Sequence, residues 1–172
     1  GGEPEKYTIP FIDDASVENS VICAAVALRL GVPAATLCER MATLEPVAMR
    51  LEVKEGNNGC TLINDSYNSD INSLDIALDF MNRRPDHKGR RRTLILSDIF
   101  QSGMEPQMLY KEVSDLARKR GVVKFIGIGP ALTNYAGSIQ ISEKYFFSTV
   151  QQFISSNVFH SLSDEVILLK GA

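Results

Sequence analysis

The stretch TLINDSYNSDINSLDIALDF, residues 61–80, decides the fold. It opens with a short apolar run and continues through seven hydrogen-bonding residues, 64–70, without glycine or proline. It then ends with apolar positions spaced as on one face of a helix. This order predicts a buried strand, a tight turn and a helix. A turn that only reversed the chain would more simply use glycine, so the polar side chains at 64–70 raise the question of a binding role.

The same alternation continues to the end of the chain. Strands are expected at 93–98, 123–129, 144–148 and 165–171, and helices at 72–83, 106–120, 132–136 and 150–159. An antiparallel hairpin, strands 50–55 and 60–65 around an Asn-Asn-Gly turn, comes before them. We therefore predict an α/β fold, with a Rossmann-like, mostly parallel sheet and helices on both faces. A short helical segment, with helices at 16–30 and 33–44, comes first.

Composition narrows the class of protein. The 172 residues are 44% hydrophobic with a net charge of −3, which fits one domain, or one domain plus part of a neighbour, and indicates no nucleic-acid partner. No apolar run reaches the roughly 20 residues that span a membrane. Cys23, Cys38 and Cys60 are expected to be buried thiols in a reducing cytoplasm. His87 and His160 lack zinc-ligand spacing, so no metal site is predicted.

One run of charge, residues 83–92, contains five arginines and one lysine. Most such runs are solvated loops, and that is our interpretation here. Steering of an anion is the less common alternative.

Polar residues follow the predicted strands, and ligands of such sheets bind beyond the carboxyl ends of the strands. Asp65 fits a carboxylate that accepts hydrogen bonds from ribose hydroxyls, but a helix cap at Asp65 or Asn68 is the commoner role. Asp98 fits a crevice carboxylate or a turn former equally well. Lys170 suits an anionic ligand group, and its alternative is a cation that reaches solvent from a chain end. Gly127 and Gly129 lack the third glycine of a dinucleotide fingerprint and indicate a tight turn.

Several catalytic motifs do not occur in the sequence. There is no Gly-x-x-x-x-Gly-Lys-[Ser/Thr] loop, no Gly-x-Ser-x-Gly and no His-Glu-x-x-His. The 172 residues therefore hold no complete catalytic machinery, and by themselves are expected neither to hydrolyse ATP nor to form a bond with its energy.

Five stretches, in the same order along the chain, resemble motifs of the Mur ligases, the ATP-dependent amide-forming family of peptidoglycan synthesis. IPFIDDASVENSVICAAVALRLGV (9–32) is similar to the asparagine-bearing helix that closes the central ATPase domain of the family. LEPVAMRLEV (44–53) resembles the Pro-x-x-x-Arg-Leu-Glu start of its C-terminal domain, and LINDSYNSDINS (62–73) resembles its Asp-Asp-Ser-Tyr-Asn-Ala-Asn-Pro-x-Ser segment. LILSDIFQSG (94–103) and LLKGA (168–172) resemble its Gly-Asp-Met-x-Glu-Leu-Gly and Lys-Gly-Ser stretches.

The resemblance implies a domain organisation and an activity. Residues 1–42 would be the tail helices of the central ATPase domain, and 43–172 the C-terminal Rossmann-like domain. Within the family the likeness is to the branch that adds D-alanyl-D-alanine to UDP-N-acetylmuramoyl-tripeptide through an acyl phosphate. That reaction implies ATP and Mg²⁺, the latter held mainly by the central domain. It also implies the two substrates, the remaining domains of the ligase as partners, and a cytoplasmic location.

The resemblance also assigns nucleotide contacts. Asn19 would contact the adenine, Arg50 would reach the phosphates or ribose, and Asp65 would hold the ribose hydroxyls.

Substrate contacts follow in the same way. Tyr67 and Asn68 would line the cleft near the reacting groups, and Lys170 would meet a carboxylate of the amine substrate. Asp98 is a further candidate for that pocket.

The sequence departs from the family pattern at Asp70, Ile71, Ser97 and Ala172, which stand where Asn, Pro, Gly and Ser are usual. A branch fused to alanine racemase shows similar divergence. Two alternatives stay open: a non-catalytic nucleotide- or peptide-binding module of the same fold, and a folylpolyglutamate synthetase-like ligase.

Overall fold

The computed structural model describes residues 6–45, 49–84, 89–100 and 102–171. These residues belong to two compact units, Gly1–Val47 and Ala48–Ala172. The sequence motifs placed the division five residues earlier, and that the first unit is the tail of an ATPase domain stays a prediction. No helix in the described ranges is long and apolar enough to cross a membrane.

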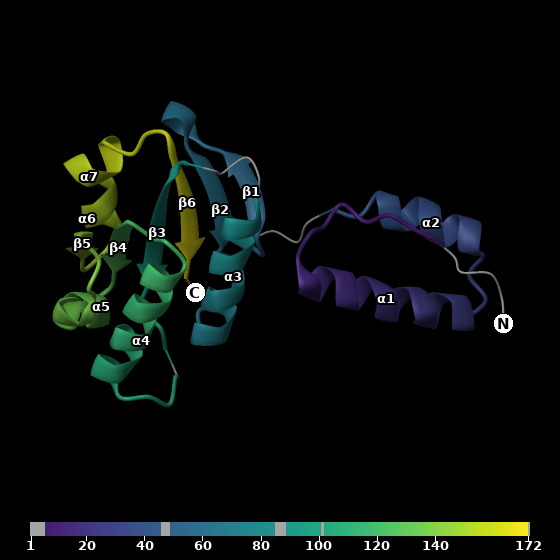
Figure 1. Cartoon of the computed structure of the whole chain (residues 1–172), viewed down its shortest axis with the longest axis horizontal. Helices are drawn as coiled ribbons and strands as arrows, with labels where there is room; N and C mark the ends of the chain where they lie inside the picture. The colour runs from purple at the N-terminus through teal and green to yellow at the C-terminus, as the bar shows by residue number, and fades with distance from the viewer. Residues whose placement is uncertain (1–5, 46–48, 85–88, 101, 172) are drawn as a thin grey trace. The chain divides into compact units, whose positions relative to one another are not determined.

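The first unit is a pair of helices, α1 (Asp14–Arg29) and α2 (Ala34–Ala42), as expected from the sequence (Figure 1). Its small core gathers around Ala24, Leu37 and Met41. That core covers little of the apolar stripe of α1, because the side chains along it are largely exposed: Val17, Val21, Val26 and Leu28.

The second unit is built on one six-stranded sheet, in the order β1-β2-β6-β3-β4-β5 (Figure 1). The strands are β1 (Glu52–Glu55), β2 (Thr61–Asp65), β3 (Arg91–Ser97), β4 (Lys124–Ile128), β5 (Glu143–Phe147) and β6 (Glu165–Lys170). β1 pairs with β2 antiparallel, across the short 3-10 turn η1 (Asn57–Gly59), and all other pairs are parallel. The predicted mostly parallel α/β sheet is therefore confirmed.

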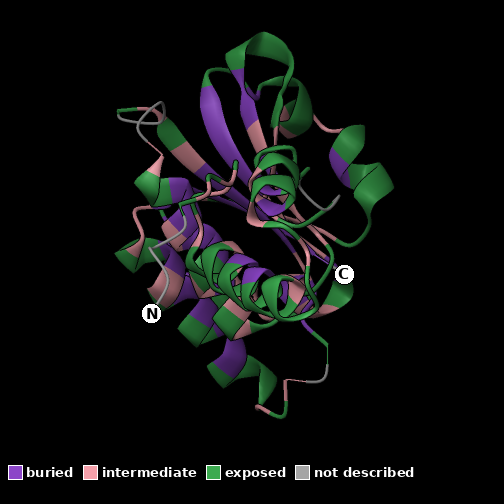
Figure 2. Cartoon of the chain, turned by 90° about the vertical axis from the view of Figure 1, so that its right-hand side faces the viewer, coloured by how far each residue is buried: buried purple, intermediate pink, exposed green. Residues whose placement is uncertain are grey.

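Helices cover both faces of this sheet because successive strand residues point to opposite faces. Leu94 and Leu96 face one core, whose helices are α3 (Ile71–Arg83) and α4 (Pro106–Lys119), with α5 (Pro130–Asn134) and η3 (Ala136–Ser138) at its side. Ile95, between them, faces a second and smaller core under α6 (Val150–Ile154) and α7 (Asn157–His160). Figure 2 shows the result, with buried residues along the strands and exposed residues on the outer faces of the helices.

Three sequence expectations differ from the structure. The helix expected at 150–159 is two short helices, because the Ser156 hydroxyl donates to the Phe153 carbonyl and accepts from the Phe159 N–H, which starts α7 anew. Cys60 is buried as expected, but Cys23 is exposed and Cys38 is partly exposed. The apolar pattern around them lies on helices whose outer faces the first unit leaves uncovered.

The basic run at 83–92 is only in part a solvated loop. Residues 85–88, His87 among them, lie outside the described residues. Arg90 donates to the Thr61 hydroxyl and to the carbonyls of Gly59 and Glu165, which fastens the start of β3 to its neighbours. Arg91 begins β3 and pairs with Glu143. The guanidinium groups of Arg90 and Arg91 therefore bind neighbouring strands of the sheet.

Asp70 starts α3. Its carboxylate accepts from the Ser73 N–H at 2.9 Å, and the Ser73 hydroxyl accepts in turn from the Asp70 N–H at 3.3 Å, which completes a capping box. The Ser73 N–H is the largest cause of a lowered pKa of Asp70. A lowered folded-state pKa means that the stabilisation is present above the ordinary value of 3.8 and is lost as pH falls through the folded-state value.

We therefore expect Asp70→Ala to lower the free energy of unfolding by about 1 kcal/mol at pH 7, as measured by urea denaturation. The deficit should shrink when the same titration is made at about pH 3, because below the ordinary value of 3.8 the unfolded chain takes up a proton that the folded carboxylate resists. Asp115→Ala is the control, since Asp115 is exposed in α4 and pairs only with Arg118 on the same surface. Equal stability of the two variants at pH 7 would contradict the capping role.

Gly129 makes the turn from β4 into α5. Its φ of +139° is a backbone conformation that side-chain-bearing residues rarely adopt. A Cβ built at this position would lie 2.3 Å from Cγ of Asp98. The predicted tight turn at this glycine is confirmed, and its physical cause is the Asp98 carboxylate packed against the backbone.

Gly129→Ala should therefore lower the free energy of unfolding by about 2 to 4 kcal/mol, from backbone strain together with the clash. Gly137→Ala is the matched control, because no atom lies within 4 Å of a Cβ there. Thermal unfolding of both variants gives the comparison. A Gly129→Ala protein that melts with the control would show that the turn relaxes freely.

Candidate functional site at the carboxyl edge of the sheet

Parallel pairing brings residues far apart in the sequence to one edge of the sheet. Asp65 at the end of β2 lies opposite Lys170 at the end of β6, and Leu96 near the end of β3 is the partner of Lys170 on its other side. The turn that leaves β2, residues 65–70, and the loop that leaves β3 therefore both begin at this edge.

Lys170 is the most deeply buried charge at the edge. Its side chain is 1% exposed, and its ammonium lies 2.9 Å from Asp65 Oδ2 and 3.3 Å from the Asp65 carbonyl oxygen. It also donates to the carbonyl of Asn68. The side chain does not reach solvent, so the snorkelling alternative is wrong. The predicted contact with a substrate carboxylate stays a prediction, and in this conformation the ammonium is occupied by the protein.

The other oxygen of Asp65 accepts from the Leu51 N–H at 3.2 Å. The Asp65 carboxylate therefore joins the residues before β1 to the end of β6. The helix-cap alternative for Asp65 and Asn68 is wrong, because Asp70 caps α3. The ribose contact of Asp65 stays a prediction, and the side chain of Asn68 is exposed to solvent.

Arg50 and Tyr67 form an exposed pair at the same edge. The guanidinium carbon lies 4.3 Å from the centre of the Tyr67 ring, a cation–π contact, and the ring is itself 52% exposed. The residues on either side of Arg50 have left-handed backbone, with φ of +60° at Met49 and +50° at Leu51. Of the candidates in this unit, Arg50 offers the exposed cation that a phosphate group requires.

Asp98 is 5% exposed and committed to the fold. Its two oxygens accept from the N–H groups of Ala131 and Leu132 at 3.0 and 2.8 Å, at the start of α5. The Tyr110 hydroxyl donates to the same carboxylate at 3.5 Å. Burial, followed by the charge of Asp98, raises the pKa of Tyr110 to about 12. Of the two roles left open for Asp98, this geometry favours the structural one.

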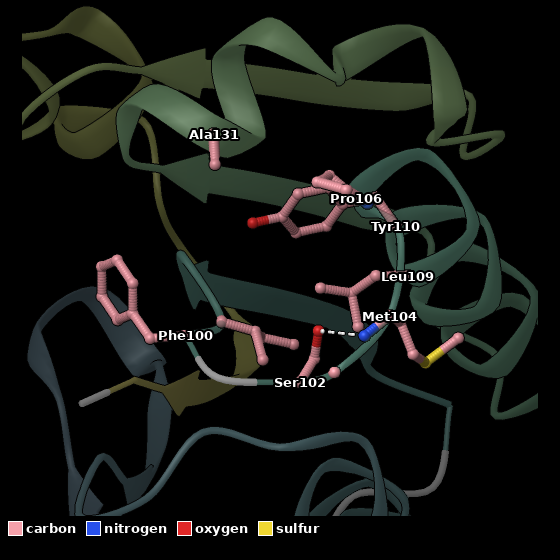
Figure 3. Close-up of a pocket in the computed structure, with 9 residues that line it drawn as sticks. Phe100, Ser102, Met104, Pro106, Leu109, Tyr110 and Ala131 are labelled. Carbon is pink, nitrogen blue, oxygen red and sulfur yellow. Dashed lines mark hydrogen bonds between the residues drawn. The ribbon is translucent and has the colours of Figure 1, made fainter.

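A pocket of about 290 Å³ lies beside Asp98, in front of the loop that follows β3. Its walls are mainly apolar, and Figure 3 shows the Tyr110 hydroxyl directed into the space between Phe100 and Ala131. Ser102, also in the wall, accepts from the Met104 N–H at 3.2 Å. No sequence pattern indicates this pocket, because its lining residues come from a loop and two helices.

Asn19 and Ala172 belong to other parts of the chain. Asn19 is exposed on α1, in the first unit, and its contact with adenine stays a prediction. Ala172 lies outside the described residues. Within the described ranges, no group of three or more His, Cys, Asp or Glu side chains is placed to hold a metal ion.

Known proteins of similar sequence include D-alanyl-D-alanine-adding ligases. No family model matches the chain. The UDP-N-acetylmuramoyl-tripeptide–D-alanyl-D-alanine ligase of Buchnera aphidicola subsp. Acyrthosiphon pisum is 24% identical over 169 residues, 96% of this chain and 35% of the relative. The ligase of the same name in Escherichia coli is 22% identical over 121 residues, 70% of this chain and 26% of the relative. The chain therefore spans about a third or less of the length of these relatives.

Solved structures show the same fold. A UDP-N-acetylmuramoylalanyl-D-glutamyl-2,6-diaminopimelate–D-alanyl-D-alanyl ligase from Acinetobacter baumannii matches with a TM-score of 0.73 and 19% identity, over 96% of this chain and 35% of that one. The MurF ligase of Thermotoga maritima, solved in complex with ADP, matches with a TM-score of 0.72 and 16% identity, over 94% and 36%. The fold is that of Mur ligase C-terminal domains, and the predicted resemblance to the D-alanyl-D-alanine-adding member of this family is confirmed.

Proposed function

We propose that this chain is the C-terminal part of an ATP-dependent amide ligase that adds D-alanyl-D-alanine to UDP-N-acetylmuramoyl-tripeptide. The observation that carries the proposal is the match to ligases of that name, which in one case runs along 96% of the chain. The geometry supports it, because exposed polar and cationic groups gather at the carboxyl edge of a parallel sheet, where ligands of such sheets bind.

In the proposed reaction, ATP phosphorylates the carboxylate of the tripeptide, and the dipeptide amine attacks the acyl phosphate. A tetrahedral intermediate then expels phosphate. The part of this chain is to position the amine and to complete the nucleotide site, which lowers the barrier through proximity rather than through a chemical step of its own. Without a phosphate-binding glycine loop in the sequence, the 172 residues alone are expected to show no turnover.

Two residues of this unit fit ATP. Arg50 presents an exposed guanidinium, which suits phosphate or ribose oxygens. Asp65 suits ribose hydroxyls, because its carboxylate oxygens have lone pairs left for them beside the bonds from Leu51 and Lys170. Asn19 of the first unit is the proposed adenine contact. The described residues do not fit Mg²⁺, since they offer no cluster of carboxylates, and the proposal leaves the ion to the rest of the ligase.

Tyr67 and Asn68 are the proposed substrate contacts, because both side chains are exposed at the edge. Lys170 and Asp98 are less suited to direct contact, since both are buried and bonded to the protein. The proposed setting is the cytoplasm, together with the remaining domains of the ligase. Fusion to an alanine racemase stays a prediction.

The test is a titration of the isotope-labelled chain, followed by amide NMR. Addition of D-alanyl-D-alanine should shift the signals of Tyr67 and Asn68, whereas L-alanyl-L-alanine and glutamate should not. Asn68→Ala should weaken these shifts, and Asn157→Ala, which removes an exposed asparagine from α7, should leave them unchanged.

The other outcomes decide between the alternatives. Shifts with glutamate alone would transfer the proposal to a folylpolyglutamate synthetase-like ligase. Shifts with Mg-ATP but with no amine would favour a nucleotide-binding module, and no shift with any of these compounds would contradict the proposed substrate site.

A further inference from the structure

We propose that Lys170 is a positioning residue, which holds the candidate nucleotide contacts Asp65 and Arg50 in place and does not itself bind the substrate. The proposal rests on the proposed function only for the identity of the ligand. The contacts that carry it lie within the second unit and exist without any ligand.

The Lys170 ammonium has no donor left for a ligand. A lysine ammonium carries three N–H donors. Three acceptors surround it: Oδ2 of Asp65, the carbonyl of Asp65 and the carbonyl of Asn68. Because the Lys170 side chain is only 1% exposed, a substrate carboxylate could reach the ammonium only if it displaced one of these partners inside the protein.

Lys170 also fixes the position of the Asp65 carboxylate. One oxygen faces the ammonium at 2.9 Å, which leaves the other directed at the Leu51 N–H at 3.2 Å. Since Asn68 is bound through its carbonyl, both ends of the 65–68 segment are fastened to the same ammonium. The turn therefore holds its shape through one side chain from β6.

This turn also contacts the residues on either side of Arg50. Met49 and Leu51 hold left-handed backbone conformations, which are unfavourable for residues with side chains and persist only where contacts impose them. The contacts come from the turn: Leu51 donates to Asp65, and the Tyr67 N–H donates to the Met49 carbonyl at 3.2 Å. Arg50 lies between them, over the Tyr67 ring. Removal of the ammonium should therefore release Arg50 as well as Asp65.

The first test uses the unmodified chain. The ¹⁵N-labelled Lys170 ammonium should give an NMR signal that exchanges slowly with water, because the group is buried. This signal should stay in place while D-alanyl-D-alanine shifts other signals. A fast-exchanging ammonium, or an ammonium signal that follows the dipeptide titration, would overturn the proposal.

The second test is Lys170→Met, which keeps most of the length of the side chain and removes the ammonium. The amide hydrogens of Leu51 and Tyr67 should exchange with solvent roughly tenfold faster or more. The hydrogen bond of each amide is weakened, and the loss of one such bond changes an opening equilibrium by about a factor of ten. The Ile126 amide in β4 reports on the stability of the whole sheet, and its exchange should change less. Lys144→Met is the control, because Lys144 lies in β5 and also donates to a backbone carbonyl, that of Ile139, away from the turn.

The results separate this proposal from the proposed function. Faster exchange at Leu51 and Tyr67 relative to Ile126 supports the positioning role whether or not the dipeptide binds. Equal acceleration at all three amides would reduce Lys170 to a general contributor to stability and overturn it. If Lys170→Met does not fold, the ammonium measurement on the unmodified chain still decides. An ammonium that shifts with the dipeptide would support the proposed function while it refutes the positioning role.

Discussion

The pairing of β2 with β6 is the constraint on which the candidate site at the carboxyl edge depends. It places Asp65 opposite Lys170, residues 105 positions apart, and so creates a buried ion pair where two parallel strands end. The shape of the 65–70 turn, and through it the position of Arg50, follows from this contact.

The two ends of the sheet use buried charge in different ways. At the amino edge, Lys124 pairs with Glu165, which also accepts from the Thr93 hydroxyl, so each charge is satisfied by side chains within the sheet. At the carboxyl edge, Lys170 is satisfied in part by backbone carbonyls of a turn. The first arrangement joins strands to one another, whereas the second orders a loop whose side chains face solvent. That difference is what makes the carboxyl edge suited to binding.

Much of the fold could be predicted from the sequence, because periodicity in a chain such as residues 61–80 reflects burial directly. Asp65, Asp98 and Lys170 lie at or directly after the carboxyl ends of strands, as the sequence predicts. Their contacts could not be predicted, because the partners of Lys170 and Asp65 depend on strand order and register. Met49 and Leu51 adopt left-handed backbone without the glycine that usually indicates it in a sequence. The two roles considered for Asp98 could be separated only by its contact with the start of α5. The exposure of Cys23 could not be predicted, because it follows from the small apolar core of the first unit, which leaves much of α1 uncovered.

The most direct test of the account is a crystal structure of the 172-residue chain grown with saturating D-alanyl-D-alanine. The account predicts the dipeptide at the carboxyl edge of the sheet, beside Tyr67 and Asn68, with the Lys170 ammonium still bonded to Asp65 and to the turn. A dipeptide carboxylate bound directly to Lys170, a dipeptide bound elsewhere on the unit, or an empty edge would contradict it.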